Sequence, residues 1–138
     1  MNTEKMDKKT LLTTLWIFVT LNYLYCDVMG LMDAKVLNEI LTGTVNGMNM
    51  NESFLLGAAI LMEIPMGMVL LSRILKYKAN RLANIIAGGI MTLVQIASLF
   101  LGSPTKYYIF CSVIEISTTA FIVWYAWKWL EVKNVPAN

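Results

Sequence analysis

The feature that most constrains this chain is an apolar stretch at about residues 54–75, which is long enough to cross a lipid bilayer. Similar stretches predict further spans at about residues 11–32, 82–101 and 107–130. Because backbone groups inside a bilayer must pair with one another, each span is expected to be a helix. We therefore predict an all-α fold, a single membrane domain over residues 1–138. Its architecture is an integral membrane four-helix bundle with antiparallel, up-down spans.

Composition and charge support a membrane protein. Hydrophobic residues make up 57% of the chain and charged residues 14%, whereas soluble domains carry roughly a quarter charged residues. The N-terminal segment, the second loop and the C-terminal segment hold three, four and two of the 11 Lys and Arg residues. The positive-inside rule therefore predicts a multi-pass protein with cytoplasmic N- and C-termini. No basic patch of the kind that binds nucleic acid is evident.

The first loop is predicted to lie on the outer membrane surface. Its apolar residues recur at helical spacing: Val36, Leu37, Ile40 and Leu41. This pattern predicts a short amphipathic helix parallel to the membrane. A turn-rich segment follows, and either Asn51 or Ser53 is expected to cap the second span.

Several common sites are excluded by residue type. The chain has no histidine, which rules out bis-histidine haem, H-E-x-x-H zinc sites and Ser-His-Asp triads. Cys26 and Cys111 lie in apolar stretches and are expected to be buried thiols rather than a disulfide. Met62 and Met66 offer thioethers to Cu(I), but no Cys or His cluster accompanies them, so we interpret them as core residues. Neither a metal nor a cofactor is predicted.

Carboxyl groups inside the predicted spans are the strongest functional signal. Counting about 1.5 Å of rise per residue places Asp27, Glu63, Gln95 and Glu115 within about 8 Å of the bilayer centre. Ionisable side chains at this depth usually face a bundle interior or a water-filled cavity. We predict that these groups meet in a polar pocket. Glu63 and Glu115 would be its protonatable core, with Asp27 at the outer mouth and Gln95 orienting the ligand.

Three further residues complete the predicted site. Tyr23 lies four residues before Asp27 and therefore shares its helix face, with Asn22 beside it. Pro65 is expected to kink the second helix close to Glu63, as in transporters whose broken helices form midplane sites. The plain structural alternative is that each carboxyl is neutral and joins helices by hydrogen bonds, with Asn22 as an interhelical link.

Three classes of function fit this pattern. The first is a pocket that binds or transports a small cationic or lipophilic solute, with proton coupling as an extension. The second is a membrane-embedded enzyme that uses Glu63 and Glu115 as acid and base on a lipophilic substrate. The third is a structural or assembly protein. The expected partners are the lipid bilayer, a small-molecule ligand and, for a bundle of this size, further copies of the chain as a homo-oligomer.

The stretch from Leu15 to Asp33, L-W-I-F-V-T-L-N-Y-L-Y-C-D-V-M-G-L-M-D, resembles the first span of a family of small bacterial four-span membrane proteins without an assigned activity. Looser similarity extends to E-I-P-M-G in the second span and E-I-S in the fourth. The resemblance implies a protein of the bacterial inner (plasma) membrane and transfers no catalytic residue. In size the chain is also similar to small multidrug-resistance transporters, but their membrane glutamate lies in the first helix, where this chain has Asp27.

Overall fold

A computed structural model describes residues 7–129 and is built from helices, apart from one small hairpin. The helices and strands are α1 (Lys8–Met32), α2 (Ala34–Leu41), β1 (Thr44–Val45), β2 (Met48–Asn49), α3 (Glu52–Ile74), α4 (Tyr77–Ser98) and α5 (Lys106–Lys128). By length and composition, α1, α3, α4 and α5 could cross a membrane. Segments 1–6 and 130–138, which carry Lys5 and Lys133 of the predicted basic side, lie outside the described residues.

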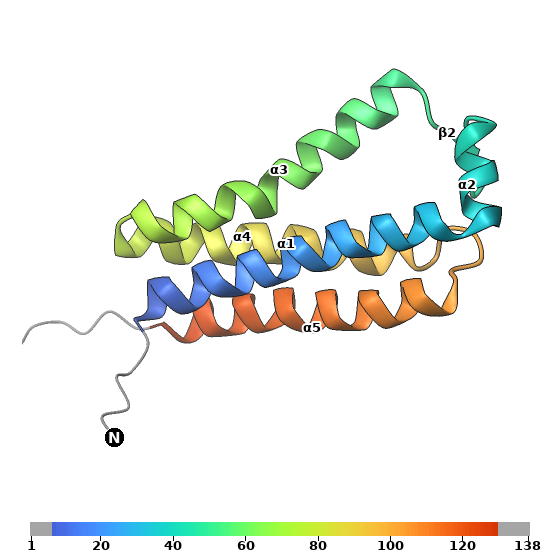
Figure 1. Cartoon of the computed structure of the whole chain (residues 1–138). Coiled ribbons are helices and arrows are strands. Elements are labelled where there is room, and N and C mark those ends of the chain that lie inside the picture. Colours follow the sequence, from blue (N-terminus) through green and yellow to red (C-terminus); the bar gives the residue numbers. More distant parts are fainter. Residues whose placement is uncertain (1–6, 130–138) are drawn as a thin grey trace, which may run out of the picture.

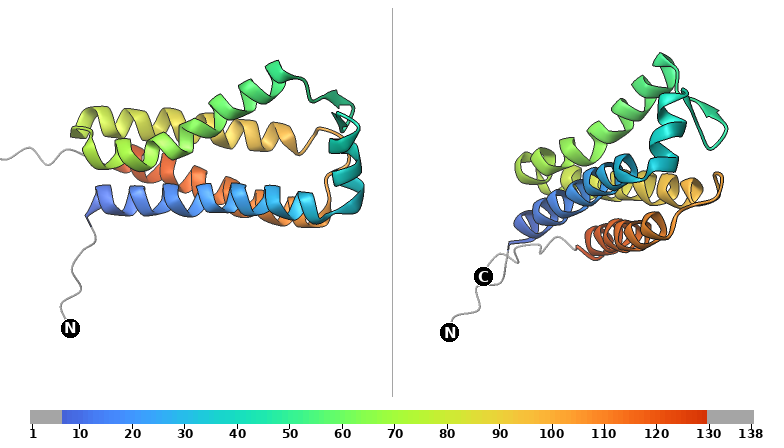
Figure 2. Two further views of the ribbon diagram at one scale, coloured as in Figure 1. Left: turned by 45° about the horizontal axis from the view of Figure 1, so that its top comes forward. Right: turned by 45° about the vertical axis from the view of Figure 1, so that its right-hand side comes forward.

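The long helices pass back and forth between two ends of the molecule (Figure 1). Helices α1 and α4 run away from the end where the described termini lie, and α3 and α5 return to it (Figure 1). The most extensive packing is between α4 and α5, and α1 packs against both α3 and α5. The short helix α2 lies across the far end, where it connects α1 to the hairpin (Figure 2).

Local chemistry explains how the connection between α1 and α3 is built. Asp33 caps α2, because its Oδ1 accepts from the backbone N–H of Lys35 at 3.0 Å. The predicted cap by Asn51 is confirmed, since its Oδ1 accepts from the N–H of Phe54 at 2.9 Å. The hairpin was not expected from the sequence. Its turn residues Asn46 and Gly47 have φ values of 49° and 78°, the Asn-Gly pattern that favours a type I′ turn.

Helix α4 begins at Tyr77, earlier than the predicted start at residue 82. Its first turns contain basic residues, which the hydropathy criterion placed in a loop. Arg81 is accommodated there because its Nε and Nη2 donate to the carbonyls of Ala126 and Trp127, both at 3.1 Å. Arg81 thereby pairs carbonyls in the last turn of α5, where helical partners run out, and adds a second donor to the Ala126 carbonyl, which also accepts from the N–H of Trp129 at 3.3 Å.

The packed core lies in the half of the bundle near the termini. Its fully buried members include Leu12 and Trp16 of α1 and Ile122 of α5, each 0% exposed. Helix α3 contributes buried residues only in its C-terminal half, where Pro65, Met68 and Ser72 lie. Residues 52–60 are all exposed on the surface of the chain. Helix α3 therefore diverges from α1 and α4 toward the hairpin, as both views in Figure 2 show.

One glycine allows the close approach of α4 and α5. A Cβ atom at Gly88 would lie 2.8 Å from Cγ2 of Val123 and 3.2 Å from the carbonyl oxygen of Thr119. Contacts this short are not tolerated, so only glycine permits the observed separation of the two backbones. The adjacent Gly89 has no atom within 4 Å of such a Cβ, so a side chain there would meet open space.

Candidate functional site

The centre of the candidate site is the Glu115 carboxyl, on the face of α5 that packs toward α1. Glu115 is 1% exposed, and neither Oε1 nor Oε2 has a hydrogen-bond partner within residues 7–129. The hydroxyl of Tyr23, in α1, is also buried and unpartnered within the same residues. Buried polar groups in folded proteins nearly always have partners, so two neighbouring exceptions need an explanation.

Helices α1 and α5 bring these groups near one another. Tyr23 and Asp27 of α1 and Tyr108 of α5 are close enough to Glu115 for a charge on one group to affect the other. Tyr23 and Asp27 are four residues apart and so lie on one face of α1, as predicted. Asp27 itself is exposed on the surface of the chain, next to the buried pair. The arrangement therefore has a buried acid, a buried phenol and a second acid at the edge.

On the α4 side of the site, the polar side chains already have hydrogen-bond partners. The Nε2 of Gln95 donates to Oγ of Ser112 at 2.8 Å, and the hydroxyl of Tyr108 donates to Oγ of Ser98 at 2.7 Å. Ser98 in turn donates to the backbone carbonyl of Gln95, also at 2.7 Å. These bonds hold the Gln95 amide against α5, so this wall of the site is rigid and already paired.

Glu63 lies apart from this cluster, and the predicted meeting of three carboxyls does not occur in the structure. Glu63 is exposed, whereas Pro65, two residues later, is buried against the bundle. Side chains two residues apart in an α-helix point in directions about 200° apart around the helix axis. Because Pro65 packs against the bundle, Glu63 points to the opposite face of α3. Equal depth along two helices does not imply a shared face, which is why counting the helix rise could not reveal this separation.

Asn22 differs from the interhelical link considered from the sequence, whereas the kink expected at Pro65 stays a prediction. The Nδ2 of Asn22 donates at 3.5 Å to the carbonyl of Phe18, in the same helix, rather than to another helix. Pro65 lies inside α3, which continues as one helix from Glu52 to Ile74.

A buried polar network near the termini was missed by the sequence analysis. Four residues from three helices form it, each with 0% exposure: Trp16, Ser72, Asn80 and Asn84. Asn84 accepts from Trp16 Nε1 at 2.7 Å and from Ser72 Oγ at 3.3 Å, and its Nδ2 donates to Oδ1 of Asn80 at 2.7 Å. Asn80 donates to the carbonyl of Ser72 at 2.6 Å. The i, i+4 spacing of the two asparagines was a usable signal, but the predicted span began between them.

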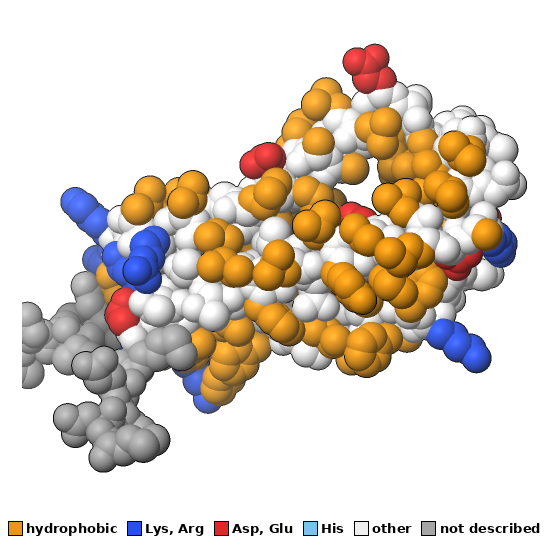
Figure 3. Space-filling model, in the orientation of Figure 1, with side chains coloured by type: hydrophobic (Ala, Val, Ile, Leu, Met, Phe, Trp, Pro, Cys, Tyr) orange, Lys and Arg blue, Asp and Glu red, His pale blue; other side chains and the backbone are white. Residues whose placement is uncertain are grey.

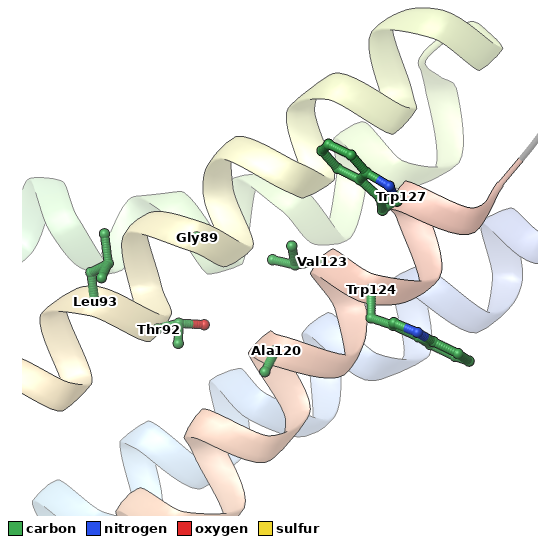
Figure 4. Close-up of a pocket in the computed structure, with 7 residues that line it drawn as sticks. All are labelled: Gly89, Thr92, Leu93, Ala120, Val123, Trp124 and Trp127. Atoms are coloured by element: carbon green, nitrogen blue, oxygen red, sulfur yellow. The ribbon is translucent and has the colours of Figure 1, made fainter.

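A separate apolar groove of about 370 Å³ lies between α4 and α5 (Figure 4). Gly89 and Leu93 line it from α4, and Trp124 and Trp127 line it from α5. None of the predicted site residues lines this groove, so it is distinct from the acidic site.

Comparison with known proteins connects this architecture to a family. The sequence matches the family model of DUF6326, a family of unknown function, over residues 2–135. The chain belongs to the DUF6326 family. No curated protein and no solved structure matches it. Support for a function of this DUF6326 member therefore comes from its own residues.

Proposed function

We propose that this DUF6326 protein crosses a bacterial inner membrane four times, with antiparallel helices and both termini in the cytoplasm. The support is the length and apolar character of α1, α3, α4 and α5, together with the placement of charge. Most Lys and Arg side chains in Figure 3 gather at the end of the molecule near the termini. We also propose that Pro65 bends α3 where it leaves the bundle, since proline removes a backbone donor there.

We further propose that the protein binds a small, partly apolar cationic solute at Glu115, and that transport is an extension of this binding. The observation that supports binding is the buried, unpartnered Glu115 carboxyl next to the unpartnered Tyr23 hydroxyl, both within the described residues. A carboxylate in an apolar interior needs a cation or several donors, and it becomes neutral without them. A cation with an apolar body would satisfy the carboxylate, and its surface would suit the surrounding core.

The divergence of α3 supports a route to this site. Figure 3 shows a hollow between α3 and the rest of the bundle, with acidic side-chain atoms visible in it. Asp27 is exposed and interacts electrostatically with Glu115, so it is suited to attract a cation before the buried acid binds it. Glu63 has no role in the proposed cation site at Glu115. The acid–base enzyme with Glu63 and Glu115 as partners therefore lacks support.

The test uses two substitutions of the same chemistry in different surroundings, Glu115→Gln and the matched control Glu63→Gln. Tetraphenylphosphonium, a lipophilic cation, is titrated into each purified full-length protein by calorimetry. Glu115→Gln is expected to weaken binding about tenfold or more, which corresponds to ~1.4 kcal/mol or more. Glu63→Gln is expected to leave it unchanged. Equal affinity for wild type and Glu115→Gln would contradict the proposal.

A chemical probe provides a second readout. Dicyclohexylcarbodiimide modifies carboxyl groups in apolar surroundings, and peptide mass spectrometry locates the adduct. We expect modification at Glu115 and protection of Glu115 by tetraphenylphosphonium. Modification without protection would place the cation elsewhere and so reject the assigned site.

A further inference from the structure

Two hollows lie end to end along one face of α4. The apolar groove of about 370 Å³ is lined from α4 by Gly89, Thr92 and Leu93. A second hollow of about 240 Å³ is lined by Tyr77, Lys78, Arg81, Leu82 and Ile85. Positions 78, 82, 85, 89 and 93 are separated by three or four residues, so they form a single stripe on the helix. The two hollows therefore follow one another along this stripe, and we call the stripe from the basic end into the apolar region the path.

The deep part of this path is suited to a hydrocarbon chain. Gly89 leaves space in the groove, because a Cβ added there would have no atom within 4 Å. Trp124 and Trp127 line the groove from α5. Gly89 lies about 18 Å along the helix from Tyr77, by the rise per residue, which reaches well below the headgroup level. The exposed fractions of Trp124 and Trp127, 50% and 65%, show that this wall lies on the surface of the chain, which faces lipid if the helices cross the membrane as proposed.

The shallow part of the path is cationic. Lys78 and Arg81 line the second hollow. Arg81 also donates to the carbonyl of Trp127, a residue that lines the apolar groove, so the two hollows share this contact. Two of the five guanidinium N–H groups of Arg81 are used on α5 carbonyls, through Nε and Nη2. A third cation lies at the edge of the groove, where Lys128 Nζ is 4.6 Å from the centre of the Trp124 ring.

We propose that this path binds one anionic phospholipid, with an acyl chain in the groove and its phosphate headgroup at Lys78 and Arg81. Charge complementarity selects this occupant, because an apolar groove that ends in two or three cations matches a molecule with an apolar tail and an anionic head. Basic pockets between membrane helices are known to bind acidic lipid headgroups in this way. A partner helix would instead need apolar contact along the whole stripe, including its basic end.

The test measures quenching of tryptophan fluorescence by lipids with brominated acyl chains. Full-length protein is placed in phosphatidylcholine bilayers that contain a small fraction of brominated phosphatidylglycerol or brominated phosphatidylcholine. Trp124 and Trp127 are exposed, whereas Trp16 and Trp129 are buried, so quenching reports mainly on the groove. We expect brominated phosphatidylglycerol to be enriched at the site about fivefold per cation. Equal quenching by the two lipids would overturn the proposal.

Two variants, each with a matched control, test whether the preference for phosphatidylglycerol arises along this path. Lys78→Gln should lower the phosphatidylglycerol preference, whereas Lys76→Gln, which changes an exposed lysine outside the hollow, should preserve it. Gly89→Leu should fill the groove and remove the preference, whereas Gly57→Leu, at another open glycine, should not. If Lys78→Gln behaves like Lys76→Gln, or Gly89→Leu keeps the preference, the lipid is not bound along this path.

Discussion

Trp16 of α1 donates its indole N–H to the side-chain oxygen of Asn84 in α4, at 2.7 Å, although the two residues are 68 positions apart. Both side chains are fully buried, and every polar atom of the Asn84 amide is paired. Glu115 lies in the same bundle with both carboxyl oxygens unpartnered within the described residues. The contrast separates a polar cluster whose hydrogen bonds hold helices together from one whose groups lack such partners, which is where we propose that a ligand binds.

Removing the Asn84 amide should destabilise the protein. Asn84→Ala leaves the buried Trp16 N–H and Ser72 hydroxyl without their acceptor, at a cost of about 1–3 kcal/mol in the free energy of unfolding. Denaturation in mixed detergent micelles measures this change. Asn22→Ala is the control, because Asn22 bonds only weakly to its own helix, and it should have a much smaller effect. Equal effects would show that the buried network contributes no special stability.

The two adjacent glycines of α4 should respond oppositely to the same substitution. Gly88→Ala places a methyl group 2.8 Å from Val123 and must separate α4 from α5, with an expected cost of about 1–3 kcal/mol. Gly89→Ala meets open space and should be neutral or stabilising by about 0.5–1 kcal/mol, through better helix propensity. Melting temperatures of the two purified variants check the difference. A destabilised Gly89→Ala protein would contradict the packing described for α5.

Replacing Glu115 by methionine should increase stability and abolish cation binding. Methionine is similar in length and fills apolar gaps, and the change removes an unpartnered buried polar group, which is expected to stabilise by about 1–3 kcal/mol. Unfolding in detergent and tetraphenylphosphonium titration measure the two effects on one sample. A marked loss of stability would instead indicate that Glu115 joins helices, which is the structural alternative.

Cation binding should weaken as the pH falls. A carboxylate attracts the cation and a neutral carboxylic acid does not, so protonation of Glu115 competes with the ligand. Asp27 responds in the same direction, whereas Tyr23, Tyr108 and Gln95 carry no charge at neutral pH. Titrations over the pH range of the folded protein should show this trend in wild type. In Glu115→Gln it should be largely absent, and an unchanged pH dependence there would assign the effect to another acid.

Arg81 should stabilise the end of α5 through its geometry as well as its charge. Arg81→Lys keeps the charge but loses the planar fork that reaches the carbonyls of Ala126 and Trp127. Faster amide hydrogen exchange is expected in the last turn of α5, measured by mass spectrometry. Lys78→Gln, one turn earlier on α4, serves as the control and should leave exchange in α5 unchanged.

The sequence alone determined the helices of this fold, although not the small hairpin. Hydropathy located four long helices, and helical spacing located α2, whose observed range is Ala34–Leu41. Asn51 was recognised as a cap because capping depends on neighbours within one turn. All of these features are local, and local patterns are readable without knowledge of the tertiary contacts.

Tertiary structure decided which polar groups meet. Depth along a helix can be counted from the sequence, but the rotation of each helix about its axis is set by packing against its neighbours. The burial of Pro65 turned Glu63 outward, and the contact of α1 with α5 brought Tyr23 to Glu115. The divergence of α3 and the network around Asn84 likewise depend on contacts between helices far apart in the chain, which no local pattern encodes.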